Sequence, residues 1–262
     1  MDQATLMLIL AILPVILVLL FVYNKDKSKE PFSLLIQLFG LGIASCFLVL
    51  LVSNFLGLFI PFMAKDLKEL NEIEVFLYAF FGIALVEEIC KWIMVYYKGY
   101  NHQEFDEVYD IIVYAVFVSL GFAFFENILY VFGSGSLATA ILRAVSAIPG
   151  HACDAVFMGY FLSLAKQFYY KGEVEKEKKY IALSIIVPAI LHGIYDYCLL
   201  SGIIPLLLVF IIFVIFLYIN SIKTLKKVSE ENKRLIEKYN FCRYCGYKIE
   251  GDYCGGCGAK VE

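Results

Sequence analysis

Long apolar runs separated by short charged segments dominate the chain. Seven of these runs are close to the length that an α-helix needs to cross about 30 Å of hydrocarbon. We predict membrane-spanning helices at residues 4–23, 32–55, 75–97, 108–132, 150–168, 180–200 and 203–222. Another apolar stretch, residues 137–148, is too short to cross and predicts a half-helix or a short amphipathic helix. The pattern indicates an all-α polytopic membrane protein.

The composition of the chain favours the same class. Of its 262 residues 61% are hydrophobic, which is more apolar sequence than a soluble domain of this size can bury. The net charge of −3 gives no electrostatic reason to expect nucleic acid as a partner. The first residues, MDQATLMLIL, lack the basic region of a signal peptide, so we expect a first span here and not a processed leader.

The basic residues of the loops predict the orientation. Lysines gather at residues 25–29 between the first two spans, at residues 166–179 between the fifth and sixth, and again after the seventh. With seven spans these three segments lie on one side, which the positive-inside rule makes cytoplasmic. We therefore expect a multi-pass cell-membrane protein with its N-terminus outside and its C-terminus inside.

The character of the chain changes after residue 222. Residues 1–222 form the predicted transmembrane domain, and residues 223–240 predict a charged helical linker. Residues 241–262 hold two CxxC pairs, each followed by glycine, and their cysteines are Cys242, Cys245, Cys254 and Cys257. This spacing is typical of structural zinc held by four thiolates. Two disulfides are the alternative, which a reducing cytoplasm disfavours. We expect a small zinc ribbon.

Two adjacent acids lie in the middle of the third predicted span, VFLYAFFGIALVEEICKWIMVYY. A charge at this depth costs roughly 2.5–3.5 kcal/mol, so Glu87 and Glu88 are expected to have a function. Helical spacing places Lys91 beside both carboxylates. One lysine neutralises only one of two acids, which leaves a carboxylate free to act as a general base. The alternative is a buried ion pair with a purely structural role.

Three later spans carry further polar residues of the kinds that transfer protons and bind metals. These are Glu126 and Asn127 in GFAFFENILY, His151 and Asp154 in PGHACDAVFMGY, and His192 and Asp196 in LHGIYDY. Each histidine has an acid three or four residues later on the same helix face, where a carboxylate can fix the imidazole tautomer. In the predicted topology these groups converge with the glutamate pair in the outer half of the bilayer. The alternative for Glu126 is a hydrogen-bonded structural acid.

The ordered set EEICKW, GFAFFENILY, PGHACDAVFMGYFL and LHGIYDY resembles the PrsW family of intramembrane proteases, which is related to the CAAX prenyl endopeptidases. The likeness covers about residues 87–196. It implies a peptidase that cuts membrane-anchored proteins, with anti-sigma factors cleaved from the outer side as the best-known substrates. It also implies catalytic function for Glu87, Glu88 and His192, with Glu126 and His151 in the same site. The cysteine-rich tail is not part of the family pattern and implies an accessory module.

Two mechanisms fit these residues. In the first, His151, His192 and one carboxylate, either Glu126 or Glu88, hold a catalytic zinc, and Glu87 is the base. In the second, Glu87 activates water without a metal, and a histidine together with Asn127 stabilises the oxyanion. The sequence lacks HExxH, the commonest zinc signature, but the convergence of two histidines with several acids favours the metal.

Two other classes of protein compete with a protease. Buried acids and histidines also form the proton relays of transporters, but the inverted repeat typical of transporters is not visible in the sequence. A non-catalytic scaffold that presents the zinc ribbon would not need the intramembrane acids. We expect a protease whose partners are a membrane-anchored protein substrate and the lipid bilayer.

Overall fold

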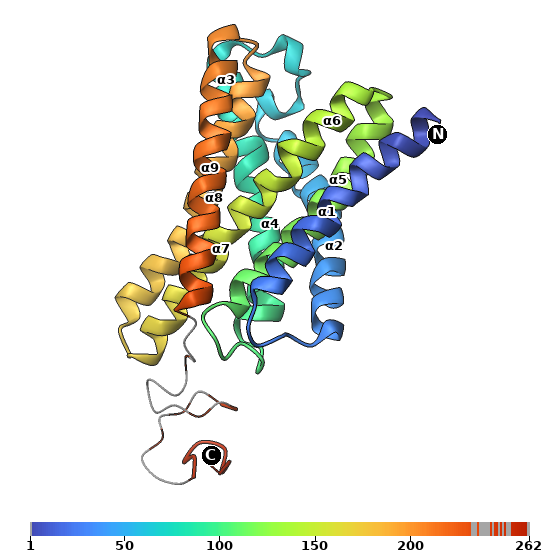
Figure 1. Ribbon diagram of the computed structural model, residues 1–262. Coiled ribbons are helices and arrows are strands. Elements are labelled where there is room, and N and C mark those ends of the chain that lie inside the picture. Colours follow the sequence, from blue (N-terminus) through green and yellow to red (C-terminus); the bar gives the residue numbers. More distant parts are fainter. Residues whose placement is uncertain are drawn as a thin grey trace.

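The computed structural model of the chain describes residues 2–231, 235, 242, 244–245, 247, 249 and 253–260. Up to residue 231 every regular element is a helix, and the described residues of the tail contain one isolated bridge between Tyr253 and Lys260. The long helices stand side by side in a single bundle (Figure 1). The prediction of an all-α protein is therefore confirmed for the part of the chain that is described.

Six segments of the described chain are long and apolar enough to cross a membrane. They are α1 (Gln3–Lys25), α2 (Phe32–Gly57), α5 (Asp110–Ser134), the pair α6 (Leu137–Val145) and α7 (Ala147–Tyr170), α8 (Val174–Leu200), and α9 (Ile204–Glu230). Helix α6 is short, as predicted, and is separated from α7 by Ser146, whose backbone is not helical. Pro149 lies in the first turn of α7, where the missing N–H costs little.

The third predicted span, residues 75–97, is helical throughout but is not one regular α-helix. After two short 3₁₀ turns, η1 (Pro61–Ala64) and η2 (Leu67–Glu69), the chain forms α3 (Glu72–Leu77), η3 (Tyr78–Ala84), α4 (Leu85–Val95) and η4 (Tyr96–Tyr100). Both η3 and η4 are π-helical. Such wide turns are often found at functional sites. Because each piece of this segment is too short to cross a membrane alone, the described residues contain six candidate spans where seven were predicted.

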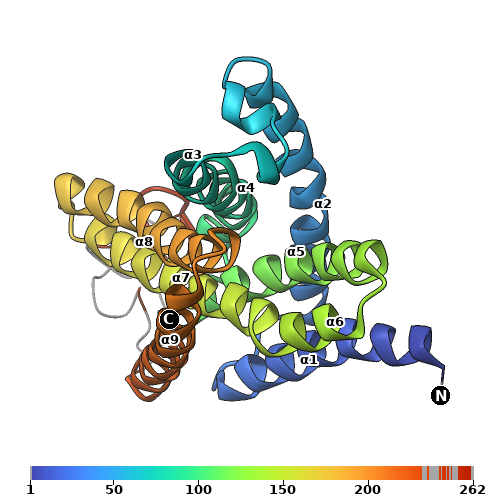
Figure 2. The same cartoon turned by 90° about the horizontal axis from the view of Figure 1, so that it is seen from above.

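Helix α5 packs against α1, α2, α4 and α7, while α8 and α9 lie on the other side of α7 (Figure 2). In its most apolar stretch 78% of the residues are buried, compared with 22% in α1 and 17% in α9. Glycines permit this packing. A Cβ atom on Gly121 would lie 2.1 Å from the carbonyl oxygen of Phe39, and one on Gly42 would lie 2.0 Å from that of Val118. The backbones of α2 and α5 thus touch, as small residues allow between membrane helices.

The outer helices present apolar side chains to the surroundings of the bundle, as a lipid-facing surface requires. On α9, for example, Leu208 is 68% exposed and Ile212 is 69% exposed. Helix α9 continues to Glu230, so the first part of the predicted linker, residues 223–230, is a continuation of this helix. Residues 232–234 and 236–240 of the predicted linker lie outside the described residues.

Candidate active site

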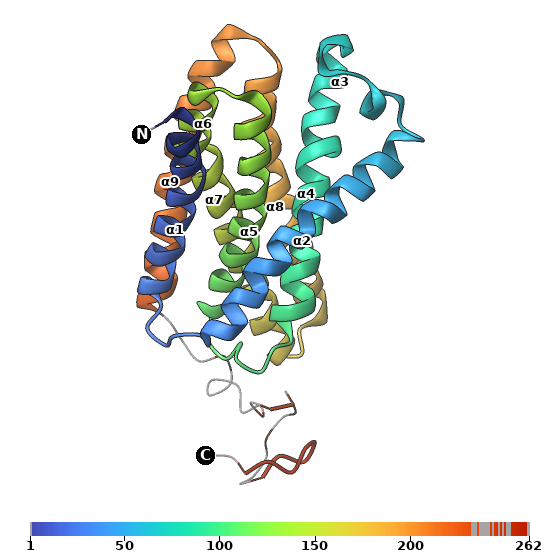
Figure 3. The ribbon, with the colours of Figure 1, turned by 90° about the vertical axis from the view of Figure 1, so that its right-hand side faces the viewer.

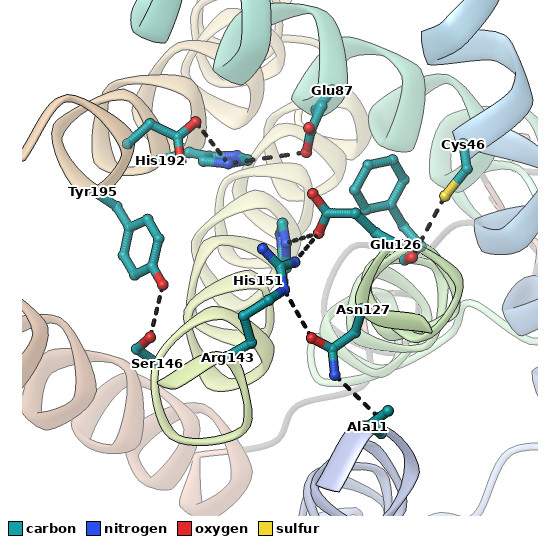
Figure 4. A network of polar contacts seen from close by, with 12 residues as sticks. Ala11, Cys46, Glu87, Glu126, Asn127, Arg143, Ser146, His151, His192 and Tyr195 are labelled. Atoms are coloured by element: carbon teal, nitrogen blue, oxygen red, sulfur yellow. Dashed lines mark hydrogen bonds and ion pairs between the residues drawn. The ribbon is translucent and has the colours of Figure 1, made fainter. Parts of the chain in front are cut away.

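The acids and histidines singled out in the sequence meet in one buried centre between α4, α5, α7 and α8. Figure 4 shows part of it, with Glu87, Glu126, His151 and His192 pointing toward one another. We call this group the buried centre, and it consists of Glu87, Glu88, Lys91, Glu126, His151, Asp154, His192 and Asp196. Glu88 and Lys91 are completely buried. Glu87, Asp154 and both histidines are nearly so, with at most 6% of each residue exposed. The sequence places these groups on separate helices, and the packing around α5 brings them together.

Lys91 is the fixed cation of the buried centre. Its Nζ donates to Glu88 Oε1 at 2.8 Å and to Glu87 Oε2 at 3.2 Å, and it lies 3.2 Å from Nδ1 of His151. The same ammonium group stands 4.1 Å above the ring of Phe122. One positive charge therefore serves two carboxylates, as helical spacing predicted, and it also fixes an imidazole of another helix.

His192 lies between the glutamate pair and an acid of its own helix. Its Nδ1 is 2.9 Å from Glu88 Oε1, and its Nε2 is 3.4 Å from Asp196 Oδ2 and 3.9 Å from Glu87 Oε2. The predicted proximity of His192 and Asp196 is present, although Asp196 Oδ2 makes no contact with the geometry of a hydrogen bond. Glu88 is thus held by both Lys91 and His192, whereas Glu87 has only its longer contact with Lys91 and a distant imidazole.

His151 does not pair with the acid that the sequence suggested. Its Nε2 is 3.1 Å from Glu126 Oε2, while its backbone carbonyl accepts from Ser119 at 2.9 Å. Asp154, the expected partner on the same helix, has a buried Oδ1 without a hydrogen-bond partner. The rings of His151 and His192 meet edge to face, with centroids 5.2 Å apart. The two imidazoles therefore share one space and are oriented by different carboxylates.

Arg143 is a member of the site that sequence analysis missed. It extends from α6, and its Nη2 donates to Glu126 Oε2 at 2.7 Å while its Nε donates to Asn127 Oδ1 at 2.8 Å. The amide nitrogen of Asn127 donates in turn to the carbonyl of Ala11 on α1 (Figure 4). The side-chain amide of Asn127, which would stabilise the oxyanion in the metal-free mechanism, therefore already holds α1 and Arg143. In the sequence, the signal that could have identified Arg143 was its position as a single arginine in the short apolar segment of residues 137–148.

Tyr195 was also not identified from the sequence, although it follows His192 by three residues on the same helix. Its hydroxyl is 2.8 Å from Ser146 Oγ, at the break between α6 and α7. Tyr195 lines a cavity of about 10 Å³, together with Ala147, Gly150, His151, Asp154, His192 and Leu217. This volume is at the lower limit for one water molecule. The space borders both histidines.

The residues of the buried centre suit a metal ion. Donor atoms of Glu88, His151, Asp154 and His192 all lie within 4.8 Å of one another, and so do those of Glu87, Glu126 and His151. Two imidazoles with carboxylates form a donor set typical of catalytic zinc. Glu88 Oε2 and Asp154 Oδ1 are buried without hydrogen-bond partners, as expected for atoms with a ligand of another kind. The first group contains both histidines together with Glu88. The predicted alternative set of both histidines with Glu126 is split, because Glu126 belongs to the second group and His192 to the first.

The third histidine and the four cysteines of the tail are not part of the buried centre. Burial and the nearby Lys98 hold the pKa of His102, in the loop after η4, below its ordinary value. The sulfur atoms of Cys242 and Cys257 are 3.5 Å apart, and those of Cys245 and Cys254 are 3.4 Å apart. No disulfide joins the cysteines, and the four sulfurs lie within 4.8 Å of one another. Such a cluster fits tetrahedral zinc, with Zn–S bonds of about 2.3 Å.

Comparison with known proteins agrees with this geometry. Residues 30–219 match the family described as PrsW family intramembrane metalloprotease. The relative named Protease PrsW from Oceanobacillus iheyensis is 41% identical over 188 residues, which cover 72% of this chain and 80% of that protein. Protease PrsW from Bacillus subtilis is 36% identical, with the same two coverages, and that from Clostridioides difficile is 32% identical over 73% of this chain and 78% of its own. No solved structure matches the chain. The match over most of its length and the identity to these relatives show that the chain belongs to the PrsW family of intramembrane metalloproteases.

Proposed function

We propose that this peptidase hydrolyses peptide bonds of membrane-anchored proteins near the extracytoplasmic side of the membrane. The observation that carries the proposal is the excess of buried carboxylates over fixed cations beside two histidines and a small cavity. The lysine-rich loops support an outside N-terminus and a cytoplasmic tail. Family resemblance makes anti-sigma factors the first class of substrate to examine.

Glu87 is the general base in this proposal. Glu88 accepts from Lys91 at 2.8 Å and also contacts His192 at 2.9 Å, so its charge is compensated. Glu87 has a contact of 3.2 Å with Lys91, and His192 Nε2 is 3.9 Å away. The less compensated carboxylate is the better proton acceptor. It would take the proton of the attacking water and return it to the leaving amine.

His151, His192 and Glu88, with Asp154 beside them, would hold the metal of the family. When bound, the metal supplies Lewis-acid chemistry that polarises the peptide carbonyl and makes a water molecule more acidic. The protein orients these ligands through neighbouring groups: Glu126 fixes the ring of His151, and Asp196 lies beside the ring of His192. Arg143 compensates Glu126, so that acid is proposed to position His151.

We further propose that the chain comprises a transmembrane protease domain at residues 1–222, a charged linker at 223–240 and a zinc ribbon at 241–262. The ribbon would hold one structural zinc through its four cysteines, independently of the buried centre. The four neighbouring sulfurs support this assignment. A module with so little core would depend on its metal to fold. We propose an accessory role in docking or regulation because the ribbon lies outside the family match at residues 30–219.

The substitution Glu87→Gln tests the catalytic proposal. It keeps the size of the side chain but removes the base, so cleavage should fall by roughly 10²–10⁴-fold. The measurement is cleavage of a single-span reporter protein in membranes that contain equal amounts of each variant. Glu175→Gln removes an acid whose side chain is 89% exposed and serves as the control. Full activity of Glu87→Gln would eliminate this residue as the base.

A further inference from the structure

A second group of buried acids lies away from the buried centre. Asp26 and Glu30 belong to the connection between α1 and α2, and Asp110 is the first residue of α5. This is the end of the bundle at which α1 ends and α2 and α5 begin, the lower end in Figure 3. Asp26 is 4% exposed, Glu30 is 6% exposed and Asp110 is fully buried. We call these three residues the three-carboxylate cluster.

Each carboxylate of the cluster is oriented by a donor from the protein. Asp26 Oδ1 accepts from the backbone N–H of Ser28 at 3.0 Å, and Glu30 Oε2 accepts from the hydroxyl of Tyr114 at 2.6 Å. Asp110 Oδ2 accepts from the backbone N–H groups of residues 106 and 107, at 3.1 and 2.7 Å. Support of one oxygen by a neighbouring donor is how proteins orient carboxylates that bind metals.

Two oxygens of the cluster remain without a partner. Asp26 Oδ2 and Asp110 Oδ1 are buried and make no hydrogen bond. One oxygen from each of the three carboxylates lies within 4.8 Å of the others. Among the described residues no ion pair with lysine or arginine involves the cluster, and the nearby Lys29 donates to the carbonyl of Tyr23 instead. Buried charged acids without a compensating cation are costly, and an external cation would supply the missing positive charge.

We propose that the three-carboxylate cluster binds a hard divalent cation of the Mg²⁺ or Ca²⁺ class. Three carboxylates and no nitrogen or sulfur donor form the ligand chemistry that such cations prefer. The bound ion joins the α1–α2 connection to the first turn of α5. Because α5 is the central helix and carries Glu126, the ion stabilises the helix on which the buried centre is built. This site is independent of the proposed peptidase mechanism.

Purified full-length protein, treated with a chelator, provides the test. Mg²⁺ and Ca²⁺ are added separately, and the unfolding temperature is measured. A ligand that binds only the folded state raises that temperature in a concentration-dependent manner. Tb³⁺, a luminescent substitute for Ca²⁺, is the second probe. Tyr114 touches Glu30, so excitation of tyrosine should sensitise emission from Tb³⁺ at this site.

The variant Glu30→Gln removes one ligand charge and should weaken cation affinity by at least about tenfold, with a matching loss of Tb³⁺ emission. Glu175→Gln, which removes an exposed acid, should retain both responses. If Glu30→Gln folds poorly, Asp26→Asn replaces it, because that change leaves the bond between Glu30 and Tyr114 intact. Stabilisation by either cation that disappears in the variant supports the site. Equal stabilisation of variant and wild type, or none in the wild type, overturns it and means that the acids hold protons instead.

Discussion

The buried centre and the three-carboxylate cluster meet the same problem in different ways. Both remove several acids from water, but the buried centre contains Lys91 and lies beside Arg143, whereas the cluster has no ion pair with a basic residue in the described chain. A fixed cation holds its acids in one arrangement and leaves a surplus carboxylate, which is useful for proton transfer. Built-in cations orient the acids of the buried centre, whereas the proposed ion of the cluster would supply the positive charge that its described neighbours do not.

Histidine substitution should have the largest effect on activity. His192→Ala removes a candidate metal ligand and the partner of Glu88, so cleavage should fall by roughly 10²–10⁴-fold. His102→Ala provides a matched control, since His102 lies in a loop outside the buried centre. Reporter cleavage in membranes measures both. Equal loss of cleavage in the two variants would contradict a specific catalytic role for His192.

Removal of the fixed cation should affect stability most. Lys91→Met leaves Glu87 and Glu88 buried without compensation, which costs about 3–5 kcal/mol when a buried pair is broken. Thermal unfolding and the amount of protein in the membrane measure the loss. The double variant Lys91→Met/Glu88→Gln should recover part of it, because the uncompensated charge is smaller. No recovery would show that Lys91 acts through packing against Phe122 and not through charge.

Loss of the second cation should be milder. Arg143→Gln removes the ion pair with Glu126 but leaves the bond between Glu126 and His151, so activity should fall by about 10–100-fold. Arg143→Lys keeps the charge and should retain more activity than Arg143→Gln. Cleavage rates of both variants at equal expression measure this difference. Identical cleavage rates in the two variants would mean that the positive charge of Arg143 does not contribute and that its guanidinium geometry does.

The cysteine tail should have the smallest effect on catalysis. The double change Cys242→Ser/Cys245→Ser removes two of the four clustered sulfurs, so about one zinc per chain should be lost. Cleavage of a short peptide substrate should remain near the wild-type rate, because the buried centre does not use these thiols. Elemental analysis measures the zinc, and a matching fall in peptide cleavage would place the ribbon within the catalytic unit.

Much of the fold could be predicted from the sequence because a bilayer requires apolar helices of a defined length. Helix length against bilayer thickness located the apolar segments, and all of them are helical in the structure. The division of residues 72–100 by π-helical turns could not be predicted from helical periodicity. The first of these turns packs against α8, where Gly193 lies against the ring of Phe80. A charged helix after residue 222 was also predicted, and in the structure α9 continues without a break to Glu230.

Taken alone, the sequence determined which acids and histidines are candidates for the chemistry of this protein. Helical spacing linked Lys91 to the glutamate pair, and the cost of burying polar groups marked the acids and histidines as functional. Only the tertiary structure decided their partners. Packing around α5 gave His151 to Glu126 instead of Asp154, added Arg143 from a separate short helix, and joined three distant acids at the far end of the bundle. Spacing along a helix fixes neighbours within it, whereas contacts between helices depend on how close their backbones can approach, which the glycines of α2 and α5 settle.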